Sequence, residues 1–314
     1  MDNCGIVKGI CISEKRGTAK QPVKEARLIA DWGLENDAHA DNWHRQVSLL
    51  AYEQIEEFRK NGAKVTPGAF GENIIVDGFD LKNIPVGSRF KCNDAILEVT
   101  QIGKECHTHC AIYNSVGDCI MPREGIFAKV IHEGMIREGD NICLLPFDND
   151  RPLTAAVITL SDKGYNGERE DKSGPLLASE LVGAGYEIVE QLLLPDDEDM
   201  LANNLIRLSD MRQVNLIVTT GGTGFGERDR TPEATLRVAT RNAPGIAEAI
   251  RAGSMQITKR AMLSREASVI RNKTLIINLP GSPKAVKESI DMVIDQLEHG
   301  IKILLGRDNE CGRI

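Results

Sequence analysis

The chain has 314 residues, a formal net charge of −8 and 41% hydrophobic residues, which suits a globular protein large enough for two domains. The negative charge disfavours a broad nucleic-acid interface, because such interfaces need clustered Lys and Arg side chains. No apolar run approaches the ~20 residues of a membrane span, and the N-terminus lacks the pattern of a signal peptide. We therefore expect a cytoplasmic protein that acts on small molecules, with no nucleic-acid or membrane partner.

Seven of the eight cysteines precede residue 150, and the eighth is Cys311. In a cytoplasmic chain, cysteines are more often free thiols, metal ligands or nucleophiles than disulfide partners. Cys11, Cys92 and Cys143 lie in apolar, strand-like segments. Each of these three is therefore predicted to be a buried, small hydrophobic residue.

The polar segment 146–152 carries two prolines and is predicted to be a linker between a domain of residues 1–147 and one of residues 152–314. Before this linker, short apolar segments are broken by Gly, Pro, Asn and Asp. Segments 84–90 and 95–100, for example, predict two strands joined by a tight turn. The first domain is therefore expected to be mostly β and barrel-like.

After the linker, apolar strands alternate with amphipathic helices, which is typical of a parallel sheet covered on both faces. The predicted strands are residues 155–160, 186–194, 214–220 and 274–279. Apolar residues spaced by three and four between Val286 and Leu304 predict one final helix, capped by Ser282 before Pro283. The second domain is therefore predicted to be an α/β domain with a doubly wound, mainly parallel sheet.

The most unusual residues of the second domain follow directly on its predicted strands. Strand 214–220 runs into Thr219-Thr-Gly-Gly-Thr-Gly224, where glycines let backbone amides approach an anion closely. The hydroxyl of Thr231 is predicted to cap the next helix, and helix N-termini favour anions. Parallel strands end at one edge of their sheet, so we expect a phosphate site at that edge.

The glycines at 221, 222, 224 and 226 fit neither the dinucleotide-binding fingerprint nor the P-loop. This spacing disfavours a hydride-transfer enzyme and a P-loop ATPase. Carboxylates at strand ends, beside a phosphate site, instead suit metal-assisted phosphoryl or nucleotidyl transfer. The competing interpretation is a glycine-rich turn without a ligand, with Asp196 or Asp197 serving only to cap the helix that follows.

Five motifs of the second domain resemble the molybdopterin adenylyltransferase family (MogA- and MoaB-like proteins) over residues 152–306. The motifs, in order, are Leu160-Ser-Asp162, Pro195-Asp-Asp197, the segment from Thr219 to Pro232, Leu263-Ser-Arg265 and the segment from Asn278 to Lys284. The resemblance implies an enzyme that transfers AMP from Mg-ATP to the terminal phosphate of molybdopterin and releases pyrophosphate. It also implies a homo-oligomer, either a trimer or a hexamer.

Matched position by position, the resemblance makes Asp196 and Asp229 the catalytic residues and the ligands of Mg²⁺. Molybdopterin and ATP are its implied small-molecule ligands, and molybdenum insertion proteins and molybdoenzymes its implied partners. Motif and resemblance together give a cofactor-binding set of Ser161, Asp162, Gly221, Gly222, Thr223, Gly224, Arg228, Ser264, Arg265, Pro280, Gly281 and Ser282.

In the first domain, Gly103-Lys-Glu-Cys-His-Thr-His-Cys110 is the conspicuous segment. Cys106, His107, His109 and Cys110 are suitable metal ligands, and neighbouring imidazolium groups are also able to lower the pKa of the Cys106 thiol. The spacing is not that of a structural zinc site, because no second ligand pair follows at the usual separation. Cys106 is therefore a candidate catalytic residue as well as a candidate metal ligand.

Other motifs of this domain resemble the MOSC domain over residues 5–145. They are Gly33–His39, Arg45–Ser48, Pro67–Asn73 and Val86–Gly87. One cysteine of that family is proposed to carry sulfur or contact the cofactor metal, and Cys106 matches it. The family often has Pro before this cysteine, where this chain has Glu105. Three roles of Cys106 are therefore compatible with the sequence: persulfide transfer, metal binding, and ligation of molybdate or tungstate. His39 and Arg45 either line the pocket or are hydrogen-bonded structural residues.

Both domains thus indicate molybdenum or tungsten cofactor biosynthesis, in which the first domain binds, sulfurates or transfers the product of the second. One alternative is a carrier that binds molybdopterin without catalysis, which the presence of both Asp196 and Asp229 disfavours. Another is a MOSC-type detoxification of N-hydroxylated compounds.

Overall fold

The computed structural model describes residues 3–60, 65–105, 113 and 117–308. The chain forms two compact units, Met1–Asp148 and Asn149–Ile314. Cys106, His107, His109 and Cys110 lie outside the described residues, so the predictions made for them stay predictions. No helix in the described ranges is long and apolar enough to cross a membrane.

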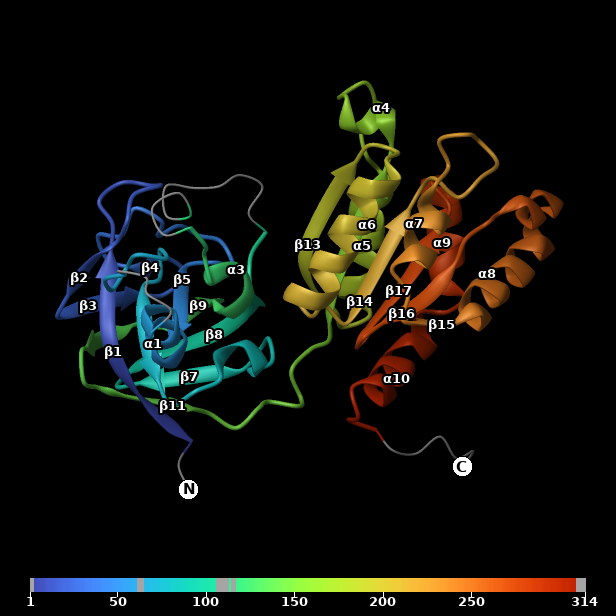
Figure 1. Ribbon diagram of the computed structural model, residues 1–314. Coiled ribbons are helices and arrows are strands. Elements are labelled where there is room, and N and C mark those ends of the chain that lie inside the picture. The colour runs from blue at the N-terminus through green and yellow to red at the C-terminus, as the bar shows by residue number, and fades with distance from the viewer. Residues whose placement is uncertain (1–2, 61–64, 106–112, 114–116, 309–314) are drawn as a thin grey trace. The chain divides into compact units, whose positions relative to one another are not determined.

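The first unit is a closed barrel of seven strands in the order β11-β7-β8-β9-β5-β6-β1, with β1 pairing back to β11 (Figure 1). Every pairing in this ring is antiparallel except that of β5 with β6. The prediction of a mostly β, barrel-like fold is therefore confirmed. The strands are β1 (Cys4–Ile12), β5 (Val47–Ala51), β6 (Ile74–Asp77), β7 (Arg89–Cys92), β8 (Ala95–Ile102), β9 (Ile126–His132) and β11 (Asn141–Leu144).

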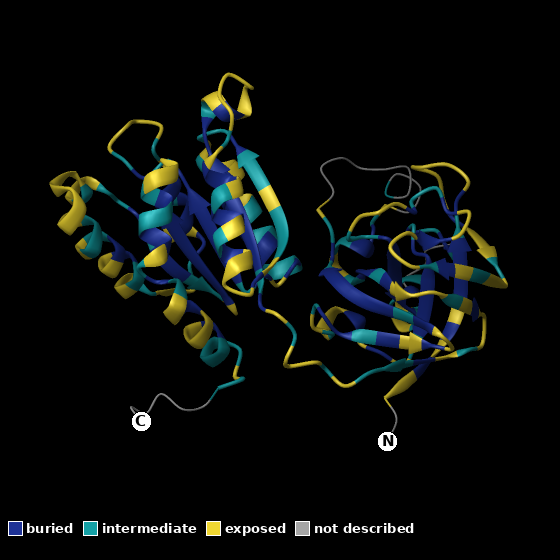
Figure 2. Ribbon diagram, turned by 180° about the vertical axis from the view of Figure 1, so that it is seen from behind, coloured by how far each residue is buried: buried dark blue, intermediate teal, exposed yellow. Residues whose placement is uncertain are grey.

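Side chains that alternate along the strands fill the barrel. In β1, for example, buried and exposed residues alternate from Cys4 to Val7, as the period of two in a strand requires. Ile10, Leu49 and Phe90 belong to the buried core cluster of this unit. Figure 2 shows that buried residues run along the strands of this unit. The remaining elements are β2 (Gln21–Val23), β3 (Glu25–Ile29), β4 (Gly33–Leu34), β10 (Gly134–Arg137), α1 (Tyr52–Lys60), η1 (Leu81–Asn83) and α3 (Met121–Glu124).

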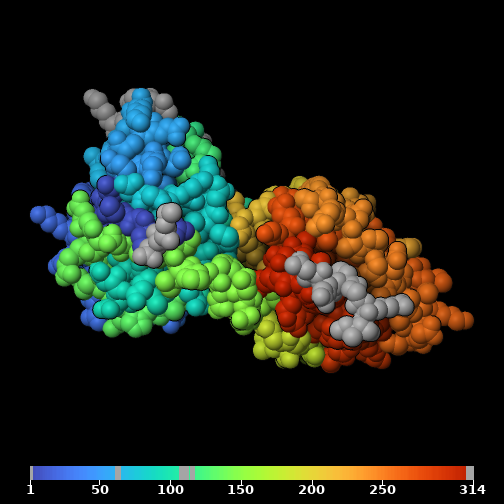
Figure 3. Space-filling model, turned by 90° about the horizontal axis from the view of Figure 1, so that it is seen from below, coloured from blue at the N-terminus to red at the C-terminus, as the bar shows by residue number. Residues whose placement is uncertain are grey.

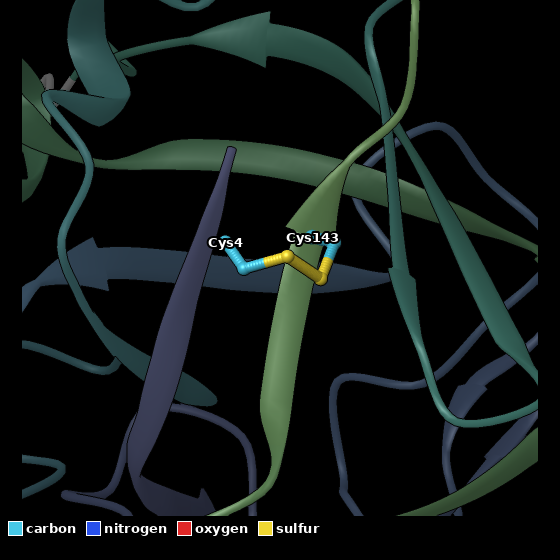
Figure 4. Close-up of a disulfide and its surroundings, with 2 residues drawn as sticks. All are labelled: Cys4 and Cys143. Atoms are coloured by element: carbon cyan, nitrogen blue, oxygen red, sulfur yellow. A yellow bond between two sulfur atoms is a disulfide. The ribbon is translucent and has the colours of Figure 1, made fainter. Parts of the chain in front are cut away.

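A disulfide joins Cys4 and Cys143, which are directly paired residues of β1 and β11 (Figure 4). The prediction that Cys143 is a buried hydrophobic residue is therefore wrong. The two cysteines are 139 residues apart in sequence, and only closure of the barrel brings them together. Cys11 and Cys92 are buried free thiols as predicted, and burial raises the pKa of each to about 12.

The second unit is a six-stranded sheet in the order β13-β12-β14-β17-β16-β15, with helices on both faces (Figure 1). Strands β13, β12, β14 and β17 run parallel to one another. Strand β16 is antiparallel to β17, and the edge strand β15 is antiparallel to β16. The prediction of a doubly wound, mainly parallel sheet is thus confirmed. The strands are β12 (Thr154–Leu160), β13 (Glu187–Leu194), β14 (Leu216–Thr220), β15 (Arg241–Asn242), β16 (Ser268–Arg271) and β17 (Thr274–Leu279).

Consecutive residues of the central strands enter different cores. Ala155 and Val157 pack under α5, α8, α9 and α10, whereas Ala156 and Ile158 pack under α6 and α7 on the opposite face. Strands covered on both faces must be apolar throughout, which explains the unbroken hydrophobic runs in the sequence. The helices are α4 (Asp162–Tyr165), α5 (Ser173–Gly183), α6 (Glu198–Ile206), η2 (Arg207–Met211), α7 (Thr231–Arg237), α8 (Pro244–Ile257), η3 (Lys259–Leu263), α9 (Pro283–Asp291) and α10 (Ile294–Leu304).

The prediction of one final helix is wrong, because the chain forms two helices, α9 and α10. The backbone leaves the helical conformation at Val293, where φ is −131°. Val293 nevertheless stays buried with Ile290 and Leu297 in the same core, so the apolar spacing identified the buried face correctly and missed the break. Ser282 caps α9 as predicted, since its hydroxyl accepts a hydrogen bond from the Ala285 N–H at 3.3 Å.

Candidate functional site

Loops at the carboxyl ends of β12, β13, β14 and β17 surround a cavity of about 680 Å³, which we call the strand-end cavity. This volume is within the ordinary range of small-molecule sites. The predicted site residues that line it are Ser161, Asp196, Gly221, Gly222, Asp229, Gly281 and Ser282. The edge of the sheet thus brings together residues that are up to 121 positions apart, from Ser161 to Ser282.

The glycine loop after β14 has a backbone shape that only glycine tolerates. Gly221 and Gly222 have φ values of 102° and 64°. A β-carbon at Gly221 would overlap the Leu160 carbonyl oxygen, and one at Gly222 would overlap the Thr231 hydroxyl. That hydroxyl donates a hydrogen bond to the Gly221 carbonyl at 2.9 Å, so Thr231 stabilises the conformation of the glycine loop. The predicted hydroxyl cap is therefore wrong, because α7 takes Arg230 as its N-cap residue.

Asp196 follows β13 and lines the strand-end cavity. Its Oδ2 accepts a hydrogen bond from the Asp162 N–H at 3.0 Å, and Asp162 Oδ1 accepts one from the Asp196 N–H at 3.0 Å. The pKa of Asp196 is raised, mainly because burial disfavours the carboxylate, and the charges of Asp162 and Asp229 add to the effect. Neighbouring Asp197 caps α6 through the Met200 N–H at 2.7 Å, so only one of the two is available to the cavity.

Asp229 enters the same cavity from the loop before α7. Its Oδ2 accepts a hydrogen bond from the Gly226 N–H at 2.7 Å, and β-carbons at Gly224 and Gly226 would crowd the same oxygen. Arg228, next in sequence, turns away to donate to both carboxylate oxygens of Asp162 at 2.7 and 3.0 Å. This pairing lowers the pKa of Asp162. The two predicted residues Asp162 and Arg228 therefore contact each other beside Asp196.

Two polar groups of the strand-end cavity, Arg169 and Thr159, were not singled out from the sequence. Arg169 lines the cavity together with Lys172, and its guanidinium donates to the Ser161 hydroxyl at 2.9 Å. Thr159 Oγ1 is buried at the cavity wall and has no hydrogen-bond partner among the described residues. These cations lie in an irregular loop whose spacing carries no periodic signal, and an arginine there is typical of solvated surface.

Four predicted site residues line a different space. Thr223, Gly224, Ser264 and Pro280 border a cavity of about 320 Å³, which we call the second cavity. Arg265 was predicted to bind the cofactor. Its guanidinium instead stabilises the glycine loop and the segment that follows it. It donates to the Gly224 carbonyl at 2.7 Å, to the Asp229 carbonyl, and to the Glu233 carboxylate.

The first unit contains a buried ionic cluster near the predicted MOSC residues. Lys20 Nζ donates to both carboxylate oxygens of Asp37 at 2.8 and 2.6 Å, and these side chains are 3% and 0% exposed. His39 Nδ1 lies 3.2 Å from the Ser13 hydroxyl and 3.4 Å from Lys20 Nζ, which fits the interpretation of His39 as a hydrogen-bonded residue. Arg45 stacks over the Trp43 ring at 4.6 Å.

The chemistry of the strand-end cavity suits an anion together with a divalent cation. Asp196 and Asp229 line it together with the glycine loop and two basic side chains, and Glu170 and Asp171 also line it. Mg²⁺ takes oxygen ligands and commonly combines one or two carboxylates with substrate phosphates. In the described part of the chain, no group of three or more His, Cys, Asp and Glu side chains is arranged to hold a metal ion. A cation at this site would therefore share its coordination with ligand oxygens.

Comparisons with known proteins cover both units. Residues 156–299 match the model of a probable molybdopterin binding domain, and residues 36–143 match that of the MOSC domain. The molybdopterin adenylyltransferase of Helicobacter pylori J99 is 39% identical over 157 residues, covering 48% of this chain and 86% of the relative. That of Escherichia coli K12 is 40% identical over 156 residues, covering 48% and 80%. The structure of the molybdopterin biosynthesis enzyme MoaB from Thermus thermophilus covers 49% of this chain and 97% of its own, at 40% identity and a TM-score of 0.47.

The α/β unit with its strand-end cavity is thus a molybdopterin-binding domain of the class that serves molybdenum cofactor biosynthesis, and it follows a MOSC domain in the same chain. Within that class, the extent and identity of the matches show that the chain belongs to the molybdopterin adenylyltransferase family.

Proposed function

We propose that the second unit transfers AMP from Mg-ATP to the terminal phosphate of molybdopterin and releases pyrophosphate. One observation carries the proposal: Asp196 and Asp229, delivered by different strand-end loops, line the same cavity as the glycine loop. The activity named for the adenylyltransferase relatives agrees with it. A MOSC domain in the same chain supports a role in one cofactor pathway.

In the proposed reaction, a phosphate oxygen of molybdopterin attacks the α-phosphorus of ATP. A new P–O bond forms, the bond from the α-phosphorus to the bridging oxygen breaks, and pyrophosphate leaves with that electron pair. Both reactants are anions, so catalysis depends on alignment and charge neutralisation more than on a protein nucleophile. Mg²⁺ held by Asp196 and Asp229 would supply part of that positive charge. Backbone amides of Gly221 and Gly222 would orient one phosphate, and Arg169 would contact another.

The direct test supplies the purified full chain with molybdopterin and Mg-ATP, and follows pyrophosphate and adenylylated pterin by chromatography and mass spectrometry. We expect both products in equal amounts, and neither when Mg²⁺ is removed by a chelator. Retained pterin binding with no product in the presence of Mg-ATP would support the carrier interpretation instead.

For the first unit, we propose a later step in which the MOSC barrel binds, sulfurates or transfers the cofactor, with Cys106 as the reactive residue. The match of residues 36–143 to the MOSC model supports this assignment. The same assay with Cys106→Ala separates the two units, because we expect adenylylation to continue at the wild-type rate in that variant. Loss of adenylylation in Cys106→Ala would place the cysteine in the transferase step. It would contradict the assignment of the two steps to separate units.

Arg265 is expected to position the glycine loop without touching substrate. Arg265→Ala removes the two hydrogen bonds that hold Gly224 and Asp229, so we expect kcat to fall by about 10- to 100-fold through misalignment. The KM for ATP should change much less than kcat, and Arg265→Lys should restore little, because an ammonium does not reproduce the planar fork. Steady-state kinetics measure both constants. Arg237→Ala, which removes an exposed arginine paired with Asp199, is the matched control and should leave kcat unchanged.

A further inference from the structure

The Cys4–Cys143 disulfide lies on the pairing of β1 with β11, which closes the barrel and which we call the seam. Residues 4–6 of β1 pair with residues 141–143 of β11, and on its other side β11 pairs with β7 through Cys143 and Leu144. Strands β8 and β9, by contrast, are paired from Ile96 to Ile102. A strand of four residues with so short a ladder opens locally at low free-energy cost. The disulfide is therefore an important part of what holds β11 in place.

Among the described cysteines, this pair is the one that solvent reaches. Cys4 is exposed and Cys143 is half-buried, whereas Cys11, Cys92 and Cys119 are only 0%, 2% and 6% exposed. Seen from below, the dark-blue beginning of the chain and the green residues around position 140 lie at the surface of the first unit (Figure 3). A thiolate in solution therefore has access to this disulfide. Exposed disulfides are the ones that exchange readily and serve in regulation.

The barrel has a large apolar core of its own, so its fold does not depend on a covalent link. The same unit also keeps Cys11 and Cys92 as free thiols. Small domains that depend on disulfides for their fold usually pair their cysteines throughout. A single accessible disulfide beside reduced thiols is more typical of a reversible bond.

We propose that the Cys4–Cys143 disulfide is a redox switch, which closes the seam when oxidised and lets β11 separate from β1 when reduced. The electrons come from a dithiol. One of its thiolates attacks Cys4 Sγ, the S–S bond of the protein breaks, and Cys143 leaves as a thiolate that takes up a proton. The second thiol of the reductant then attacks the mixed disulfide, so that Cys4 is released and protonated and the reductant becomes a disulfide. Two electrons and two protons pass to the protein.

Both strands of the seam continue into other parts of the molecule. β11 is followed by residues 145–153, which lead to the second unit. β1 is followed by Ser13, whose N–H donates to Asp37 Oδ1 in the buried ionic cluster at 2.8 Å. Ile142 of β11 is 1% exposed, so separation of β11 also uncovers part of the apolar core. The switch thus acts on the first unit and is independent of the adenylyl transfer proposed for the second.

Hydrogen–deuterium exchange of the full chain, followed by mass spectrometry, tests the opening. The Val7 N–H donates to the Asp140 carbonyl at 2.9 Å, and the Leu144 N–H donates to the Asn3 carbonyl at 2.8 Å. After reduction with dithiothreitol, we expect peptides with these amides to exchange at least about 10-fold faster, because the seam opens more often. Peptides of β8, β9 and the second unit should keep their rates. Unchanged exchange in β1 and β11, in protein whose two cysteines are reduced, overturns the proposal.

A redox titration separates a switch from a permanent structural link. We expect the folded protein to lose the disulfide in a buffer of mostly reduced glutathione, and to recover it when oxidised glutathione is added. Differential alkylation and peptide mass mapping identify Cys4 and Cys143 as the residues that change. A disulfide that resists excess dithiothreitol until urea unfolds the barrel overturns the proposal. So does its absence from protein equilibrated with oxidised glutathione.

Cys4→Ser and Cys143→Ser are the matched variants, since each removes the bond with little change in side-chain size. Under oxidising conditions, we expect both to show the fast exchange of the reduced wild type in β1 and β11. Dithiothreitol should then change nothing further, which shows that it acts through this disulfide and not through another cysteine. Exchange in Cys4→Ser as slow as in the oxidised wild type overturns the role of the disulfide. If a variant does not fold, the comparison of oxidised and reduced wild type still decides.

Discussion

Asp229→Asn and Asp196→Asn are each expected to lower kcat for adenylylated pterin formation by about 10²- to 10³-fold, the usual loss when one group that stabilises transition-state charge is removed. Asparagine keeps the size of the side chain and an oxygen able to accept the Gly226 or Asp162 N–H. The variants therefore lose negative charge in the strand-end cavity with little change in loop structure. Pyrophosphate release at saturating Mg-ATP and molybdopterin measures the effect.

Asp197→Asn is the matched control for this prediction. Asp197 is adjacent to Asp196 and exposed, but it caps α6, and asparagine is an equally good N-cap. We expect wild-type kcat and wild-type thermal stability in this variant. A kcat in Asp196→Asn as high as that in Asp197→Asn would show that Asp196 has no catalytic role, and would leave Asp229 as the one assigned catalytic aspartate.

The strand-end cavity could be anticipated because parallel strands deliver their carboxyl ends to one edge. The sequence reduced the acidic candidates after β13 to Asp196 or Asp197. Residue type and position alone did not choose between them, because both precede the helix and both are able to cap it, and only the family resemblance selected Asp196. The choice depends on one backbone residue, Asp197, whose extended conformation (φ −123°, ψ 119°) aims its side chain at the start of α6.

Other parts of the site carry no local signal. Glu266 lines the second cavity and follows the motif Leu263-Ser-Arg265, and nothing in the spacing shows that its side chain is buried against α8 and η3. Arg265 matches a cofactor-binding position of the family, yet its three acceptors come from residues 32 to 41 positions earlier. The Cys4–Cys143 disulfide likewise depends on barrel closure across 139 residues. Sequence patterns identify which residues lie at an edge, whereas tertiary packing decides which way each one points.

The buried pair of Lys20 and Asp37 was also missed, because a lysine in a segment without apolar periodicity is typical of a solvated surface. Burial acts to raise the pKa of Asp37, but the nearby His39 ring, the Lys20 ammonium and the Ser13 N–H outweigh it and hold that pKa far below its usual range. Burial in turn lowers the pKa of Lys20. Each of the two buried charges is therefore stabilised by the presence of the other.

Lys20→Met is accordingly expected to destabilise the first unit by about 3–5 kcal/mol, because it leaves the Asp37 carboxylate buried and uncompensated. Trp32 and Trp43, the two tryptophans of the chain, both lie in this unit, so tryptophan fluorescence during urea unfolding reports its stability selectively. Lys82→Met is the control, since Lys82 is 40% exposed and pairs with Glu124 at 3.1 Å. Loss of such a surface pair should cost less than about 1 kcal/mol.

The same pair predicts how this difference changes with pH. A carboxyl whose pKa is depressed in the folded state stabilises the fold above its unfolded pKa, about 3.9, and loses that contribution as the pH falls toward the folded value. Wild-type protein should therefore lose stability below about pH 4, whereas Lys20→Met has no ammonium partner to depress the pKa of Asp37. The gap between the two proteins should narrow as the medium becomes more acidic. A gap that stays constant from about pH 7 to about pH 3 would mean that lost packing of the lysine stem, and not the uncompensated charge, causes the destabilisation.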